Sequence, residues 1–274
     1  MDQKRMWFGV FKTIIAGGTL GIHFGFAPQT LAQIVPDATL GHERSLVRGN
    51  ITTDRGLIDR IDGGAIRGGN LFHSFSEFNV GTGQRVYFSN PDRITNIISR
   101  VTGRSRSDID GTLGVLGNAN LFLINPNGIV FGPNAQLDVN RSFVATTANS
   151  VLFPDGFAFS ATNPTAPPLV TINSPLGLDS WLPTQGAIAT HGTLQTGQDL
   201  TLAGRDLNLQ GQLRAGGNLN LLASNAIAAH DSTTIPLILS AANQVVLQGQ
   251  SIDLAALSHP DSGLLAGGDM VWRS

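Results

Sequence analysis

The sequence has no cysteine, few charged residues and a single tyrosine. Without cysteine, the chain can form neither disulfides nor thiolate metal sites. Charged residues make up 13% of the chain and the formal net charge is −2, so we expect no electrostatic attraction to nucleic acid. Both lysines, Lys4 and Lys12, lie near the amino terminus. Hydrogen bonding and apolar packing therefore have to hold the fold together.

What the sequence does contain favours strands and corners. Its 274 residues are 41% hydrophobic, which is enough for a sizeable core, and 33 of them are glycine. Frequent Gly, Asn, Ser and Thr between short apolar runs are typical of many short strands joined by tight turns. Amphipathic helices are not expected from this pattern.

The first 32 residues have the features of a signal peptide. Lys4, Arg5 and Lys12 provide the positive charge, and residues 14–26 form an apolar segment of suitable length. Small residues precede a cleavage point that we place between Ala32 and Gln33. A transmembrane anchor is the alternative, but its apolar span is shorter than the roughly 20 residues that usually cross a bilayer. We therefore expect export from the cytoplasm.

A sharp corner lies near the middle of the chain. The apolar run 120–124 is followed by the turn Asn125-Pro126-Asn127-Gly128 and a second apolar run that begins at Ile129. Proline presets φ at the second turn position, and Asn-Gly tolerates the positive φ that closes a tight turn. Another corner follows within a few residues, so the pattern favours a chain that winds rather than one built of long hairpins.

The carboxy-terminal third repeats one apolar template in which apolar and polar residues alternate. Alternation with a period of two predicts strands, and constant offsets within each copy predict stacked coils with loops at one corner. A parallel β-helix is the simplest fold with these properties. The copies comprise Leu194, Leu200, Leu202, Leu207 and Leu209; Leu213, Leu219, Leu221, Ala226 and Ala228; Leu239, Val245, Leu247, Ile252 and Leu254; and Leu264, Met270 and Trp272.

Three other segments carry expectations. Phe72, Phe75 and Phe78 are predicted to plug the open amino-terminal end of the solenoid, which needs a cap. Residues 94–101 fit helical and strand spacing equally well. The proline-rich stretch 153–183, with one strand at 170–172, is predicted to be an excursion or a junction between domains.

Four arginines follow closely on one another, at positions Arg93, Arg100, Arg104 and Arg106. They could form a recognition patch for an anionic surface. Alternatively, they belong to a solvated loop that also contains aspartates.

The central corner carries a resemblance to a known family. At residues 50–150 the sequence resembles the amino-terminal secretion domain of filamentous haemagglutinin and its relatives, the two-partner secretion exoproteins. Asn125 to Ile129 match the family's NPNGI motif, and the segments 120–124 and 142–149 are similar as well. A second family motif, NPNL, would start at Asn90-Pro91, but Asp92 and Arg93 depart from it.

This resemblance implies a fold and a role. The fold would be an all-β, right-handed parallel β-helix with an amino-terminal cap and short extra-helical strands or loops. The chain would divide into a signal peptide (1–32), a secretion domain (33–165) and continuing repeats (166–274) that are incomplete at the carboxyl end. The candidate site residues, which would either contact a transporter or shape turns, are Asn125, Pro126, Asn127, Gly128, Ile129, Asn90 and Pro91.

The implied partner is an outer-membrane β-barrel transporter with periplasmic domains, which would bring the protein through the periplasm and outer membrane to the cell surface or the medium. Adhesion to host or surface glycans or proteins would be the broader role. The sequence leaves open the adhesion target, the oligomeric state and whether the chain is complete.

The runner-up is a carbohydrate-active β-helix enzyme such as a polysaccharide lyase. Such chemistry needs positioned carboxylates, whereas Asp199, Asp206, Asp253 and Asp269 are scattered beside predicted strands. Metal-ligand spacing is absent among the histidines, although His230 and His259 occupy the same looped corner in successive copies. We therefore predict a non-enzymatic exoprotein without cofactor or metal.

Overall fold

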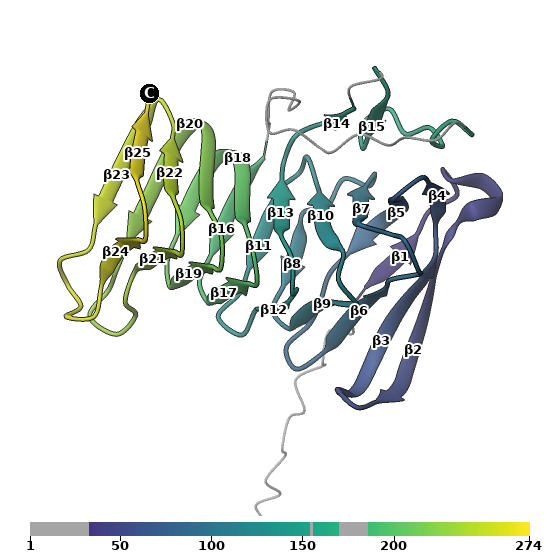
Figure 1. Cartoon of the computed structure of the whole chain (residues 1–274), viewed down its shortest axis with the longest axis horizontal. Coiled ribbons are helices and arrows are strands. Elements are labelled where there is room, and N and C mark those ends of the chain that lie inside the picture. The colour runs from purple at the N-terminus through teal and green to yellow at the C-terminus, as the bar shows by residue number, and fades with distance from the viewer. Residues whose placement is uncertain (1–32, 154–155, 170–185) are drawn as a thin grey trace, which may run out of the picture.

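The strands wind into a parallel β-helix with three faces, as the computed structural model shows (Figure 1). The structure describes residues 33–153, 156–169 and 186–274. The predicted leader and the strand expected at 170–172 lie outside these residues. Among the described residues there is no α-helix, and no helix is long and apolar enough to cross a membrane. The parallel β-helix expected from the sequence is confirmed.

Each full coil contributes one strand to each face in the order A, B, C, and the long strands β18 and β20 bend from face A into face B. Face A contains β5 (Asn70–Phe78), β7 (Asn96–Val101), β10 (Asn120–Ile124), β13 (Phe143–Thr146), β18 (Leu200–Leu209), β20 (Leu219–His230), β22 (Val245–Gln248) and β25 (Met270–Arg273). Face B contains β8 (Ser107–Ile109), β11 (Ile129–Phe131), β16 (Ala187–Thr190), the second halves of β18 and β20, and β23 (Ser251–Ala255). Face C contains β3 (Gly56–Gly63), β6 (Arg85–Ser89), β9 (Thr112–Leu116) and β12 (Gln136–Asp138), followed by β17 (Thr193–Thr196), β19 (Gln212–Ala215), β21 (Ile238–Ala241) and β24 (Gly263–Ala266). The segment 94–101, which the sequence left ambiguous, is therefore a strand over most of its length.

An amino-terminal cap covers the first coil. It consists of β1 (Ile34–Pro36), the 3₁₀ turn η1 (Gly41–Glu43), β2 (Ser45–Thr53), part of β3, and β4 (Ala65–Arg67). Here the pairing becomes antiparallel: β1 and β4 both pair with the edge of β5 that is opposite β7, while β2 pairs with β3. Of the predicted aromatic plug, Phe75 and Phe78 do lie inside the coil, where Phe78 stacks on Phe88 and Phe75 meets Phe88 edge to face. Phe72 points to the opposite side of β5, because side chains alternate along a strand.

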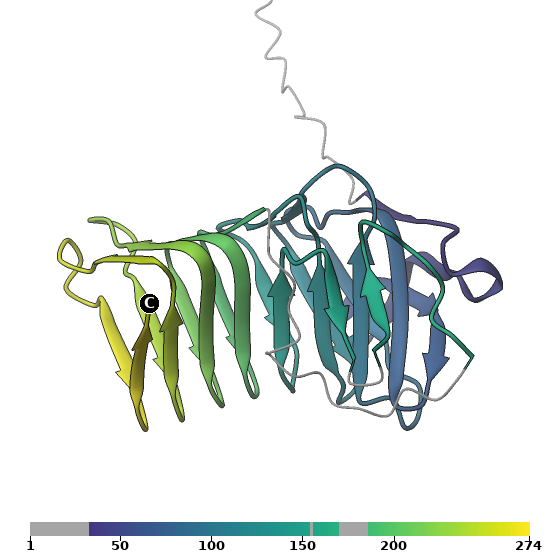
Figure 2. The same cartoon turned by 90° about the horizontal axis from the view of Figure 1, so that it is seen from above.

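The side of face A that carries Phe72 is also buried. Ile98, Phe122 and Val144 continue this row on successive strands, and all three are buried. A two-stranded antiparallel hairpin, β14 (Ser150–Leu152) and β15 (Ala158–Ser160), covers them from outside the solenoid. Figure 2 shows this hairpin lying across the face A strands of the amino-terminal half. Because face A is covered on both sides, its first strands are buried at almost every residue rather than at alternate ones.

The register of the later coils corrects one sequence assignment. Leu200 and Leu202 lie beside Leu219 and Leu221 as the repeat requires. Leu207, however, lies beside Ile227 and not beside Ala226, and Leu209 lies beside Ala229 and not beside Ala228. One additional residue in β20, at the bend between faces A and B, shifts the register between Gly204 and Asp206. This β-bulge shifts the residues of β20 that point into the interior by one position after the bend.

A ladder of polar side chains runs along the corner just before face A. Asn120 donates from Nδ2 to Oδ1 of Asn96 (2.8 Å), and Asn96 donates in the same way to Asn70 (2.9 Å). The ladder continues because the backbone N–H of each later rung donates to the side-chain oxygen of the rung before it. These later rungs are Ser142, Asp199, Asn218 and Gln244. Corner residues that are polar in the sequence thus bind consecutive coils to one another.

Candidate functional site

The predicted motif forms the corner between β10 on face A and β11 on face B. Asn125 is fully buried. Its backbone carbonyl accepts the Gly128 N–H at 3.1 Å, which closes the turn. Its side-chain Nδ2 donates to the Ser105 carbonyl (3.1 Å) and to the Ser107 hydroxyl (3.0 Å) of the preceding coil. Its Oδ1 accepts the backbone N–H of Asn127. Every polar atom of the Asn125 side chain is therefore hydrogen-bonded within the protein.

The rest of the motif completes the turn. Asn127 is exposed, but its N–H donates to Oδ1 of Asn125 (3.0 Å) and its Nδ2 donates to the Gly103 carbonyl (2.8 Å). Within the motif, the positive φ that closes the turn falls on Gly128 (117°) and not on Asn127. Pro126 and Ile129 are buried, and Ile129 belongs to the apolar core. The turn is thus bonded to the loop of the coil before it.

The second candidate motif lies at a different corner, between face C and face A. Asn90 follows β6, and in the amide orientation that satisfies its neighbours its oxygen accepts the Asn118 N–H (3.0 Å) while its nitrogen donates to the Ile94 carbonyl (3.1 Å). Pro91 is exposed, and its carbonyl accepts the Ile94 N–H at 3.2 Å. Arg93 has a φ of 68°, where asparagine or glycine would be less strained. The two motifs are therefore not brought together; each shapes its own corner.

The four arginines do not form one patch. Arg93, Arg104 and Arg106 are exposed, but Arg100 is fully buried. It lies on the outer side of face A beneath the extra-helical hairpin, where its Nη1 donates to the Ser160 carbonyl at 2.9 Å. The prediction of a shared solvated or recognition loop is therefore wrong for Arg100. Its position inside the apolar run of β7 was the one sequence signal that could have indicated burial.

Arg100 is the centre of a buried polar network that the sequence analysis missed. Its Nε donates to the Ser74 hydroxyl (2.9 Å) and its Nη2 to the Thr39 hydroxyl (2.8 Å). Both hydroxyls donate in turn to the Asp37 carboxylate, at 2.8 and 2.7 Å. Burial lowers the pKa of Arg100 to about 10, an effect that the Asp37 charge opposes. The network therefore joins the cap, face A and the hairpin.

Hydrogen bonds also set the charge state of Asp37. Desolvation favours its neutral form, but donation from Thr102 (2.6 Å), Thr39 and Ser74 outweighs it and holds the pKa of Asp37 below its usual 3.8. The carboxylate is consequently ionised at neutral pH and balances the buried guanidinium. An ion pair connected through hydroxyl groups needs no direct contact between the two charges.

A second arginine fastens the segment that follows the hairpin. Arg67 has 6% exposure and forms a bidentate ion pair with Glu43, with Nη2 2.7 Å from Oε2. Its Nε and Nη2 donate to the carbonyls of Pro168 (2.6 Å) and Pro167 (3.0 Å). The described part of the proline-rich stretch is thus an excursion from the solenoid. Arg67 and Arg100 bind this excursion to the cap and to face A. The stretch leaves the coil between face A and face B.

One interior position in the first coils is polar. His73 and Ser99 are neighbours on β5 and β7, and both are fully buried. The His73 Nδ1 lies 3.0 Å from the Ser45 hydroxyl, whereas His73 Nε2 and Ser99 Oγ have no hydrogen-bond partner among the described residues. Burial lowers the pKa of His73 to about 3, although Asp62 opposes the shift. The imidazole is therefore neutral at ordinary pH.

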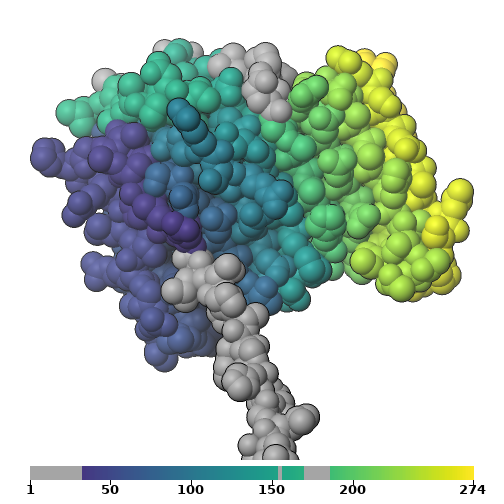
Figure 3. Space-filling view, turned by 180° about the vertical axis from the view of Figure 1, so that it is seen from behind, coloured from purple at the N-terminus to yellow at the C-terminus, as the bar shows by residue number. Residues whose placement is uncertain are grey.

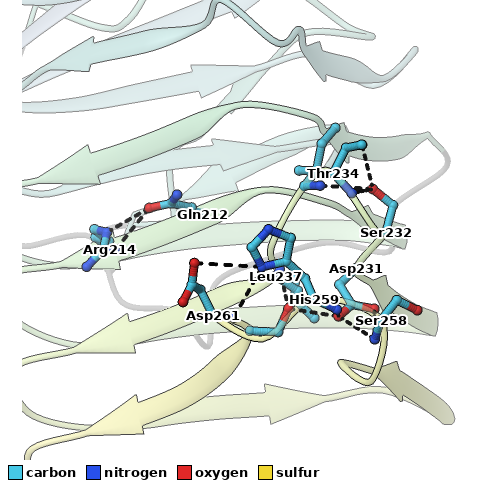
Figure 4. A network of polar contacts seen from close by, with 11 residues as sticks. Gln212, Arg214, Asp231, Ser232, Thr234, Leu237, Ser258, His259 and Asp261 are labelled. Atoms are coloured by element: carbon cyan, nitrogen blue, oxygen red, sulfur yellow. Dashed lines mark hydrogen bonds and ion pairs between the residues drawn. The ribbon is translucent and has the colours of Figure 1, made fainter.

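The looped corner of the late coils is a separate polar cluster (Figure 4). Asp231 accepts the backbone N–H groups of Ser258 (2.9 Å) and His259 (2.8 Å) and the Ser262 hydroxyl (2.8 Å), so one loop holds the next. His230 also lies at this corner, but its Nε2 is hydrogen-bonded to the carboxylate of Asp253 (2.9 Å) and not to His259. Within the described ranges, no group of three or more His, Asp or Glu side chains could hold a metal ion.

The carboxylates considered for catalysis have structural contacts. Asp199 accepts the Asn218 N–H at 2.7 Å as part of the corner ladder, and Asp206 accepts from Asn225 Nδ2 at 2.6 Å. They lie at different places on the coil, Asp199 before face A and Asp206 on face B. Asp253, on β23, is hydrogen-bonded to His230 Nε2 at 2.9 Å.

The family model described as the TPS secretion domain matches residues 32–273. A heme/hemopexin-binding protein of Haemophilus influenzae is 35% identical over 69 residues, which are 25% of this chain and 7% of that protein's length. The crystal structure of the filamentous hemagglutinin secretion domain shares 16% identity, with 88% of this chain and 99% of that chain covered at a TM-score of 0.39.

Proposed function

Because the chain belongs to the TPS secretion domain family, we propose that it is the secretion module of a two-partner secretion exoprotein. The match over residues 32–273 is the observation that carries this proposal. A dedicated outer-membrane β-barrel transporter would export the protein, and its periplasmic domains would receive the amino-terminal domain. The first 32 residues would direct the chain to the periplasm and be removed near Ala32, and the protein would reach the cell surface or the medium.

The proposed module is non-enzymatic. Residues 33–165 would carry the features that the transporter recognises, and residues 166–274 would extend the same solenoid. This division is supported by the position of both motif corners, the cap and the arginine-held hairpin, all of which lie in the first part. Export needs recognition and folding rather than bond cleavage, and the structural contacts of Asp199 and Asp206 agree with this role.

We assign different roles to the two asparagines of the central motif. Asn125 is architectural, because it is buried and all its polar atoms are bonded within the protein. Asn127 lies at the surface and binds the loop that carries the exposed Arg104 and Arg106. The motif would therefore present this loop, and the transporter would contact the loop rather than the buried amide.

Secretion and folding should be measured separately to test these roles. Asn125→Ala, Asn127→Ala and the double change Arg104→Ser with Arg106→Ser would be compared with Asn208→Ala, whose side chain is exposed on face B. Each chain would be co-expressed with a candidate outer-membrane transporter, and its amount in the medium would be recorded. Purified chains would then be unfolded in urea and tested for binding to the transporter's periplasmic domains.

The expected results differ between the variants. Asn125→Ala should lose secretion together with stability, whereas the double arginine variant should fold normally and bind the periplasmic domains more weakly. Secretion that is lost in Asn125→Ala with unchanged stability would show direct contact at Asn125 instead. Export of the wild-type chain that does not require the transporter would contradict the whole proposal.

For adhesion, the looped corner is the best-supported surface. Two successive loops, 231–237 and 256–262, project there, and Leu257 is 95% exposed. Asp231 holds both loops in one arrangement, which favours binding to a partner without a large ordering cost. Replacing residues 256–260 with a glycine-serine linker should reduce binding to host cells or glycan arrays while secretion continues. Unchanged binding would place the adhesive surface elsewhere.

A further inference from the structure

Asn127 is the one asparagine of the chain that glycine follows directly. This dipeptide lies at the exposed corner of the central motif, with Asn127 accessible to solvent and Gly128 buried behind it. Glycine has no Cβ to obstruct its own backbone nitrogen and samples many conformations when unfolded. We propose that Asn127 is a site of spontaneous deamidation. The reaction proceeds in the unfolded chain, and the folded solenoid protects Asn127 from it.

The reaction needs only the chain and water. The backbone nitrogen of Gly128 attacks Cγ of Asn127 and a C–N bond forms, closing a five-membered succinimide. The side-chain nitrogen leaves as ammonia after taking the proton of the Gly128 amide. Water then opens one of the two carbonyl–nitrogen bonds of the ring, which gives either aspartate or isoaspartate at position 127. An amide nitrogen is exchanged for oxygen, and no oxidant or reductant is involved.

Three hydrogen bonds engage the two reacting groups in the folded protein. The Gly128 N–H donates to the Asn125 carbonyl at 3.1 Å, so the attacking nitrogen is already engaged. The Asn127 side chain is held by its bonds to the Gly103 carbonyl (2.8 Å) and to Asn125 Oδ1 (3.2 Å). In addition, a Cβ built on Gly186 would lie 2.6 Å from the Gly128 nitrogen, so the next coil packs directly against that atom.

Deamidation would also impair refolding of the turn. The Asn127 amide donates two hydrogen bonds to oxygen atoms of Gly103 and Asn125. A carboxylate has no hydrogen to donate and would bring negative charge against both acceptors. Damage that arises in the unfolded chain would therefore persist as a destabilised corner. This inference rests on the local geometry and is independent of whether the chain is exported by a transporter.

Peptide mapping of the purified chain tests the proposal. The chain would be kept at one mildly alkaline pH with and without denaturing urea, and aspartate and isoaspartate at position 127 would be quantified over time by mass spectrometry. Asn134, which is exposed at the next corner and precedes alanine, is the internal control. Conversion of Asn127 should be at least about tenfold faster in urea, because the folded rate is limited by local opening. Equal rates in the two conditions, or slower conversion of Asn127 than of Asn134 in urea, would overturn the proposal.

A charge variant tests the effect on folding. Asn127→Asp should unfold at a lower urea concentration than Asn127→Ala, because the alanine loses the two bonds without adding charge. Asn208→Asp, on an exposed side chain of face B, controls for the general effect of one negative charge. An Asn127→Asp midpoint equal to that of the alanine variant would contradict the predicted effect of deamidation on the turn.

Discussion

The guanidinium of Arg100 lies 4.1 Å from the ring centre of Phe159, so a strand of the second coil is in direct contact with the extra-helical hairpin. A cation over an aromatic face is favourable, more so when both are desolvated. The same guanidinium donates to the Ser160 carbonyl and to hydroxyls of the cap. One side chain therefore links three parts of the molecule that are distant in sequence. Figure 3 shows the cap and the hairpin segment adjoining one another at the amino-terminal end.

Replacement of Arg100 should be severely destabilising. Arg100→Met keeps most of the side-chain length but removes three donors and leaves the Asp37 network without its cation. We expect the free energy of unfolding to fall by about 3 kcal/mol, as is typical when one member of a buried charged network is removed. Urea unfolding followed by circular dichroism measures this. Arg106→Met, at an exposed position, should change stability by less than about 0.5 kcal/mol.

The two motif asparagines should differ in their effect on stability. Asn125→Ala leaves buried partners of the preceding coil unsatisfied and should lower the free energy of unfolding by about 2–3 kcal/mol. Asn127→Ala removes exposed hydrogen bonds and should cost about 1 kcal/mol or less. The urea midpoints of the two variants give the comparison. Equal midpoints would mean that the buried amide is no more important than the exposed one.

The stability of the protein should decline as the pH falls below about 6.5. In the unfolded chain His73 takes up a proton near its ordinary pKa of 6.5, whereas the buried residue resists protonation until about pH 3. Unfolding therefore binds a proton in this window, and the free energy of unfolding should fall by up to about 1.4 kcal/mol per pH unit. The carboxylate of Asp37 adds a further loss below pH 3.8, because its folded pKa is depressed.

His73→Leu isolates this effect. Between pH 6.5 and 3.8, the free energy of unfolding of the variant should change less steeply with pH. The reason is that unfolding of the variant takes up one proton fewer than unfolding of the wild type. Urea unfolding at several pH values gives the slope, and His191→Leu, at an exposed position, is the matched control. An unchanged slope in His73→Leu would mean that the acid sensitivity has another origin.

Gly114 should not tolerate a side chain. Its Cβ would lie 2.5 Å from Cε1 of Tyr87, the chain's single tyrosine, whose hydroxyl donates to Asp138 at 2.8 Å. Gly114→Ala should cost about 1–3 kcal/mol through overpacking and change the near-ultraviolet signal of the tyrosine. Gly263→Ala meets no atom within 4 Å and should be nearly neutral. A stable Gly114→Ala variant with an unchanged signal would contradict the packing argument.

Sequence patterns predicted those structural features that depend only on residues close together in the chain. The turn at Asn125 was predictable because proline and glycine restrict or permit φ locally. The register at Ala226 was not, because β20 contains a run of small apolar residues in which either alternation fits an interior face. Burial of Arg100 depends on Ser160 and Phe159, which are far along the chain. Contacts of this kind leave no periodicity in the sequence.

The ladder of polar side chains at the corner before face A is directional. Each rung donates toward the amino terminus: Asn96 to Asn70, Asn120 to Asn96, and in the later coils a backbone N–H to the side-chain oxygen one coil earlier. A completed coil thus offers an acceptor to the coil that follows, and an arriving coil supplies the donor. Consecutive coils are therefore not interchangeable at this corner, because the earlier coil must present a side-chain oxygen and the later coil an N–H.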